Sequence, residues 1–134
     1  MKKLINKKRP FFSIVMPNYN SSRTIKKTIN SVNNQSYQNF ELLIIDDCST
    51  DDSILKILKE KKNQKIKIIN LKKNGGPGRA RNIGIKKSRG KYIAFLDSDD
   101  IWFKDKLMKM YDCIRKNNHD VYCHYEVFMN NNLK

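Results

Sequence analysis

The chain has 134 residues, 39% of them hydrophobic, which is enough for one globular domain with its own core. No stretch approaches the run of about 18 apolar residues that a membrane-spanning helix needs. The net charge is +15 at pH 7, a balance found in proteins that bind nucleic acids, anionic membranes or phosphorylated substrates. Most of the 28 cationic residues are scattered lysines, whereas base readout relies on arginine and interleaved aromatic residues. We therefore expect no specific nucleic-acid partner.

The N-terminus is basic over residues 1–10 and then apolar, as a signal peptide would be. Its apolar run is short, is interrupted by Pro17 and lacks a small-residue cleavage site. We interpret residues 1–10 as a tail and expect a cytoplasmic protein, with peripheral association at the inner face of the membrane as a further possibility. The three cysteines have neither zinc-site nor disulfide spacing, and we expect them to be reduced and partly buried.

Four short apolar runs predict four strands, at residues 12–16, 41–45, 66–71 and 91–96. Most are continuously apolar, which is typical of strands that are covered on both faces. The third run alternates more, so we expect it to lie closer to an edge of the sheet.

Helical periodicity separates the strands. The first stripe is Ile25, Ile29 and Val32, with Ser21 or Ser22 as the expected N-cap. Three further helical stripes are expected, one after residues 49–52, one after residues 75–77 and one over residues 103–114. A fifth strand is expected at residues 120–128.

The resulting order, β-α-β-α-β-α-β-α-β, predicts an α/β fold of Rossmann-like units with a mostly parallel sheet and helices on both faces. We place this domain at residues 11–128, followed by a tail over 129–134. Because ligands of such sheets bind beyond the carboxyl ends of the strands, four segments deserve inspection. They are residues 17–20, 46–52, 74–81 and 97–100.

The fourth strand leads into three carboxylates, Asp97, Asp99 and Asp100. Clustered carboxylates repel one another and need a nearby cation to stay ionised. Hard oxygen ligands of this kind suit Mg²⁺ or Mn²⁺ together with phosphate oxygens of a substrate. The alternative is that these residues cap a helix that starts near Trp102.

The second strand leads into Asp46 and Asp47, and a carboxylate here could accept hydrogen bonds from a nucleobase imide or a ribose hydroxyl. Helix capping is the alternative, but residues 49–51 could supply it and leave the two acids free. At the end of the first strand, Tyr19 could stack on a base, or it could be an ordinary surface tyrosine.

The third strand is followed by a glycine-rich segment over residues 74–78, where close backbone approach and a helix N-terminus favour an anion. Arg79 and Arg81 could neutralise a diphosphate there. The segment is not a dinucleotide fingerprint, because Arg81 occupies the position of the third glycine, and it is not a P-loop. A plain glycine-rich turn before a helix is the alternative.

In this order the segments resemble the family 2 glycosyltransferases, which have the GT-A type nucleotide-binding fold. The matching runs are SIVMPNYN at 13–20, FELLIIDDCSTD at 40–51, NGG at 74–76, ARNIG at 80–84 and GKYIAFLDSDD at 90–100. The resemblance covers roughly residues 11–128. Each motif alone is weak evidence for the family, whereas all of them in this order are specific to it.

The resemblance implies transfer of a sugar, with inversion, from a nucleoside diphosphate sugar (UDP being the commonest nucleotide) to a saccharide or lipid-linked acceptor. Asp97 and Asp99 would form the family's DxD pair, with Asp99 on Mn²⁺ or Mg²⁺ and Asp97 on ribose or metal. Tyr19 would flank the base, Asp46 would support its loop, and Arg81 would sit near the diphosphate or the base. The donor-binding residues implied in this way are Pro17, Tyr19, Asn20, Asp46, Asp47, Arg81 and Asp97.

The chain departs from the family pattern after the DxD pair. The acceptor-binding half of the family, with its general base, lies downstream, and none of the acids after Asp100 stands in a context resembling that base. We therefore assign no catalytic residue and expect the chain to be a truncated donor-binding portion. The alternatives are a non-catalytic nucleotide-sugar-binding module and a phosphotransferase of the haloacid-dehalogenase type, in which the aspartate pair usually follows the first strand.

Overall fold

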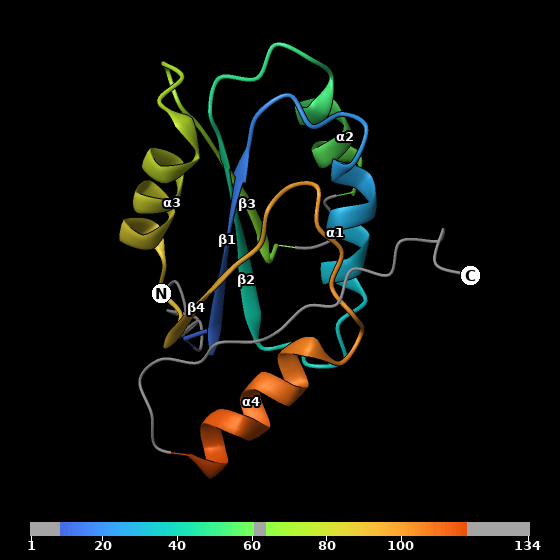
Figure 1. Ribbon diagram of the computed structural model, residues 1–134, viewed down its shortest axis with the longest axis vertical. Coiled ribbons are helices and arrows are strands. Elements are labelled where there is room, and N and C mark those ends of the chain that lie inside the picture. Colours follow the sequence, from blue (N-terminus) through green and yellow to red (C-terminus); the bar gives the residue numbers. More distant parts are fainter. Residues whose placement is uncertain (1–8, 61–63, 118–134) are drawn as a thin grey trace, which may run out of the picture.

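The computed structural model describes residues 9–60 and 64–117, in which helices and strands alternate along the chain (Figure 1). The strands are β1 (Phe12–Asn18), β2 (Phe40–Asp46), β3 (Ile66–Asn70) and β4 (Tyr92–Phe95). The helices are α1 (Ile25–Asn33), α2 (Ser53–Glu60), α3 (Gly76–Lys87) and α4 (Lys106–Lys116). The fifth strand predicted at 120–128 and both predicted tails, apart from residues 9 and 10, lie outside the described residues.

The four strands form one parallel sheet in the order β3-β2-β1-β4. Every residue of β1 and β2 is buried, as their continuously apolar sequences predict for the two inner strands. The alternating strand β3 is indeed at an edge. In the parallel register Asn18 lies opposite Asp46, so the last residues of β1 and β2 are neighbours at the carboxyl edge of the sheet.

Helix α3 covers one face of the sheet, and α1 and α2 lie on the opposite side (Figure 1). Ala80 packs with Leu43 and Ile45 beneath α3. Gly84 makes the approach of α3 possible, because a Cβ at this position would lie 2.3 Å from Cγ1 of Val15. The predicted two-sided α/β architecture is therefore confirmed.

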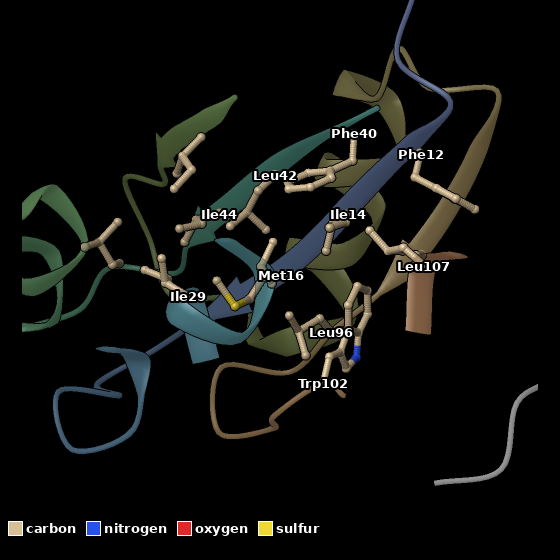
Figure 2. Close-up of a cluster of buried hydrophobic side chains, with 14 of the residues drawn as sticks. Phe12, Ile14, Met16, Ile29, Phe40, Leu42, Ile44, Leu96, Trp102 and Leu107 are labelled. Carbon is tan, nitrogen blue, oxygen red and sulfur yellow. The ribbon is translucent and has the colours of Figure 1, made fainter. Parts of the chain in front are cut away.

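The larger core lies between the sheet and the helices of the other face, where Phe12, Ile14 and Met16 of β1 meet Ile29 of α1 (Figure 2). Trp102 of the segment that follows β4 and Leu107 of α4 pack against the same core. Burial of each such side chain contributes roughly 1.5–3 kcal/mol. The core thus fixes both α1 and the segment after β4 against the centre of the sheet.

Three local predictions are wrong. Neither Ser21 nor Ser22 caps α1, because residues 21–24 form a turn before the helix, in which the Ser21 carbonyl accepts from the amides of Thr24 and Ile25. The N-cap is Thr24, which makes no side-chain capping bond. Phe103 is 69% exposed and precedes α4 instead of joining its apolar stripe. Cys48 and Cys113 are exposed, not partly buried, and both are free thiols as expected; Cys123 lies outside the described residues. Among the described helices, none is long and apolar enough to cross a membrane.

Candidate functional site

A pocket of about 400 Å³ lies at the carboxyl edge of the sheet, where the loops after all four strands converge. Parallel strands bring these loops together although they are far apart in the sequence. The pocket is lined by Pro17, Asn18, Tyr19, Asp47, Asn74, Gly76, Pro77, Arg81, Asp97, Ser98 and Asp99. Of the eight residues predicted for this site, six line the pocket, and Asn20 and Asp46 do not; the six are Pro17, Tyr19, Asp47, Arg81, Asp97 and Asp99.

The loops after β1 and β2 are held together behind the pocket by the buried carboxylate of Asp46. Its Oδ1 accepts from Nδ2 of Asn18 at 2.7 Å and from Oγ of Ser49 at 2.6 Å, and its Oδ2 accepts from the Ser49 amide at 3.0 Å. Asn20 makes a second link, since its Oδ1 accepts from the Thr50 amide at 2.8 Å. In this structure both predicted nucleotide-binding side chains, Asp46 and Asn20, support loops.

Asp47 lines the pocket, but it is not free. Its carboxylate is 2% exposed and accepts from the Gly75 amide at 3.0 Å and from the Gly76 amide at 2.6 Å. A carboxylate at this place stabilises the N-terminus of α3, where backbone amides lack partners within the helix. As expected, neither acid is needed to cap α2, because Asp51 accepts from the Ser53 amide at 3.0 Å. Asp46 and Asp47 instead accept hydrogen bonds that join neighbouring loops.

Arg81 of α3 pairs with Asp97 after β4, with Nη2 and Oδ1 2.6 Å apart. The two side chains are 34% and 48% exposed, so the pair lies at the pocket surface, in contact with solvent. Arg79, the other arginine expected near a diphosphate, donates to the Lys73 carbonyl at 3.0 Å and does not line the pocket. Only Arg81 of these two is therefore placed to meet an anion in the pocket.

The carboxylates after β4 crowd one another. Burial, followed by the charges of Asp99 and Asp97, raises the pKa of Asp100 above its ordinary value, and the nearby ammonium of Lys106 opposes the rise. None of the three aspartates caps a helix: α4 begins only at Lys106, so the capping alternative is wrong. The negative charge gathered here is what a hard cation would relieve.

The fit to a metal ion is partial within this chain. Asp97 and Asp99 both line the pocket, and their oxygens are of the type that Mg²⁺ and Mn²⁺ bind. Within residues 9–60 and 64–117, however, no three Asp, Glu, His or Cys side chains are grouped closely enough to hold an ion by themselves. An ion bound here would need further ligands from water or from phosphate oxygens.

The nucleobase end of the predicted site has one exposed ring. Tyr19 is 52% exposed at the pocket, next to Pro17, which also lines it. Sequence reasoning assigned no role to Asn18, although it is 1% exposed and donates to Asp46. No sequence pattern pointed to this contact, because it depends on the register of β1 with β2.

Together, the parallel sheet and the arginine- and carboxylate-lined pocket at its carboxyl edge define a GT-A-like α/β protein with a pocket of nucleotide-binding character. The sequence profile of glycosyl transferase family 2 matches residues 13–132. The chain belongs to this family. The phosphotransferase alternative is therefore wrong, because the chain belongs to a different family.

Individual relatives of the chain are also glycosyltransferases. The chain is 43% identical over 122 residues to WfgD of Escherichia coli, a UDP-Glc:alpha-D-GlcNAc-diphosphoundecaprenol beta-1,3-glucosyltransferase, covering 90% of this chain and 48% of that protein. It is 35% identical over 113 residues to TarS of Staphylococcus aureus, a poly(ribitol-phosphate) beta-N-acetylglucosaminyltransferase, covering 82% of this chain and 20% of that protein. The chain thus spans half or less of the length of these relatives.

The fold of the chain is similar to that of TarS. A crystal structure of S. aureus TarS in complex with UDP-GlcNAc superposes with a TM-score of 0.77 at 34% identity, covering 80% of this chain and 32% of that one. The TarS structure in complex with UDP superposes with a TM-score of 0.76.

Proposed function

We propose that this chain is the donor-binding portion of an inverting glycosyltransferase that uses a UDP sugar. The observation that carries the proposal is the convergence of Tyr19, Asp47, Arg81 and the acidic triplet (Asp97, Ser98 and Asp99) on one pocket. TarS, the relative of known structure, binds UDP and UDP-GlcNAc. A UDP sugar needs an aromatic wall for the base, acceptors for its imide and ribose, and positive charge for the diphosphate, and the pocket has each of these.

The base would lie against Tyr19 and Pro17, with Asp47 accepting from its imide. The diphosphate would then lie toward Arg81, whose guanidinium favours an anion. This orientation places the diphosphate, with the sugar beyond it, beside Asp97 and Asp99.

The acidic triplet would hold Mn²⁺ or Mg²⁺, with Asp99 as a ligand and Asp97 on metal or ribose. Such an ion supplies Lewis-acid stabilisation of the leaving diphosphate. The charges of Asp97 and Asp99, which add to burial in raising the pKa of Asp100, support this part of the proposal, because a divalent cation would offset those charges. The ion completes its coordination with donor oxygens, so we expect metal and nucleotide to bind cooperatively.

Transfer itself needs a base to deprotonate the acceptor hydroxyl, and we assign that role to none of the described residues. The acceptor proposed here is a saccharide or a lipid-linked glycan; WfgD acts on a diphosphoundecaprenol-linked one. A lipid-linked acceptor, together with the net charge of +15, favours peripheral association with the inner face of the membrane. The second candidate function is a non-catalytic nucleotide-sugar-binding module, because we assign no general base among residues 9–60 and 64–117.

Calorimetry with UDP, GDP and their sugars, with and without Mn²⁺, tests the proposal. We expect UDP to bind more tightly than GDP and to depend on the metal, and Asp99→Ala to abolish the metal dependence while leaving the fold intact. No binding of any nucleotide, or metal-dependent binding that survives Asp99→Ala, would contradict the site. Release of free sugar or sugar transfer by the 134-residue chain would exclude the non-catalytic module.

A further inference from the structure

One side of α1 carries a row of polar residues that point at the segment after β4. Thr24, Thr28, Ser31 and Gln35 follow one another at intervals of four, three and four positions, which places them on one face of a helix and its flanks. Thr28 is fully buried, and Ser31 and Gln35 are 9% and 3% exposed. We call these four residues the polar stripe of α1.

Two members of the stripe bind the acidic triplet directly. The hydroxyls of Thr24 and Thr28 donate to one and the same acceptor, the backbone carbonyl of Ser98, at 3.0 Å and 2.9 Å. Ser98 stands between the two carboxylates that face the pocket. A carbonyl oxygen with two lone pairs can accept both bonds, so its direction is fixed from two points one helical turn apart.

The other two members bind the continuation of the same segment. Oγ of Ser31 accepts from the Trp102 amide at 3.1 Å. The amide of Gln35 donates to the Phe103 carbonyl at 2.7 Å and accepts from the Leu107 amide at 3.0 Å. All four stripe residues therefore satisfy backbone groups between residues 98 and 107.

These bonds substitute for regular secondary structure. Residues 96–105 lie between β4 and α4 and belong to no helix or strand, although the Leu96 amide still donates to the Val15 carbonyl of β1 at 3.1 Å. Buried backbone groups without partners cost free energy, so a segment of this kind holds its shape only if side chains satisfy them. Leu96 and Trp102, 2% and 4% exposed, anchor the segment in the core, and the polar stripe fixes the backbone between and beyond them.

We propose that Thr24 and Thr28 are positioning residues for the acidic triplet: by fixing the Ser98 carbonyl, they hold the backbone from which Asp97 and Asp99 reach the diphosphate end of the pocket. This inference rests on the proposed donor site for its functional consequence. Neither threonine lines the pocket, so both act through the triplet and do not touch a ligand.

The test is the double variant Thr24→Val and Thr28→Val, which keeps the β-branched shape and removes both hydroxyls. We expect amide hydrogen exchange across residues 98–107 to accelerate about tenfold, and the Kd for UDP with Mn²⁺ to rise about tenfold, because the partly buried Ser98 carbonyl loses both side-chain partners. The double variant Thr24→Ser and Thr28→Ser keeps the hydroxyls and should restore both values.

Ile29→Val is the control, since Ile29 is fully buried on the same helix and bonds to nothing in the segment. Ile29→Val should lower global stability, but amide hydrogen exchange at residues 98–107 should stay unchanged relative to exchange in the strands. The proposal is overturned if the valine pair behaves like this control, or if the segment loosens while the Kd for UDP with Mn²⁺ stays unchanged. Failure of the unsubstituted chain to bind UDP would contradict the donor site, and the exchange comparison would still decide whether the threonines fix the triplet.

Discussion

Arg81 and Asp97 form an ion pair across the pocket, with Nη2 of the arginine 2.6 Å from Oδ1 of the aspartate. The pair joins α3 to the acidic triplet. In the proposed donor complex each partner has another task, because Arg81 would meet the diphosphate and Asp97 would meet metal or ribose. Without a ligand, the arginine therefore competes with a metal ion for the same carboxylate.

We expect Arg81→Gln to have opposite effects on the two ligands. Mn²⁺ alone should bind about threefold more tightly, since an exposed ion pair of this kind is worth up to about 1 kcal/mol and no longer opposes the metal. UDP should bind at least about tenfold more weakly because the diphosphate loses its cation. Separate calorimetric titrations with Mn²⁺ and with UDP measure the two effects.

Arg79→Gln is the matched control for that experiment. It removes the same charge from the same helix, but Arg79 bonds to the Lys73 carbonyl and does not line the pocket. Both affinities should change less than twofold. A parallel decrease of Mn²⁺ and UDP binding in Arg81→Gln would show that the arginine supports the acidic triplet and does not compete for it.

Asp47→Asn should weaken both the fold and the nucleotide site. The asparagine keeps one acceptor oxygen but turns a donor toward the amides of Gly75 and Gly76, which now share the carboxylate. We expect a loss of about 1–2 kcal/mol in the free energy of unfolding and lower affinity for UDP. Urea denaturation and calorimetry measure these, with Asp52→Asn, an exposed aspartate of the same loop, as the control. Unchanged stability would mean that Asp47 does not hold the start of α3.

The strands and their order along the chain follow from the sequence because burial on both faces leaves a direct mark: every residue of β1 and β2 is buried. The pocket could be placed for the same reason, since parallel strands bring their carboxyl ends together. The partners of individual side chains could not be predicted. That Asp46 bonds Asn18 depends on the register of β1 with β2, and that Thr28 bonds Ser98 depends on how α1 packs beside the segment after β4. Such contacts link residues far apart in the sequence and leave no periodic signal.

The buried carboxylate of Glu41 makes stability depend on pH. Burial alone would raise the pKa of Glu41, but hydrogen bonds from Lys67, Ser13 and Arg89 outweigh it and lower the pKa to about 2. A carboxyl with a lowered pKa stabilises the fold fully above its unfolded value, about 4.3, and the contribution is lost as the pH falls toward 2. The shift corresponds to up to about 3 kcal/mol.

Comparison of the unsubstituted chain with Glu41→Gln isolates this effect. At pH 7 the variant should be less stable by a few kcal/mol, because it leaves two cations beside a neutral side chain. Between pH 5 and pH 2.5 the difference should shrink, since only the unsubstituted chain loses the contribution of Glu41 there. Urea denaturation at several pH values measures it. Asp51, whose pKa is also lowered to about 2, is common to both proteins and cancels in the comparison. A difference that does not change with pH would contradict the assignment.

Two glycines of α3 should respond in opposite directions to alanine. At Gly84 a Cβ would lie 2.3 Å from Cγ1 and 3.2 Å from Cγ2 of the fully buried Val15, and 3.3 Å from Cγ1 of Ile45, so α3 has to move away from the sheet. We expect Gly84→Ala to destabilise the fold by about 1–3 kcal/mol, the usual cost of overpacking. Gly78→Ala is the matched control, because nothing lies within 4 Å of a Cβ there and alanine favours the helix by up to about 1 kcal/mol. Thermal denaturation of the two variants checks the contrast. Since α3 carries Arg81, Gly84→Ala should also weaken UDP binding, whereas equal stability of the two variants would mean that α3 does not rest on β1 through Gly84.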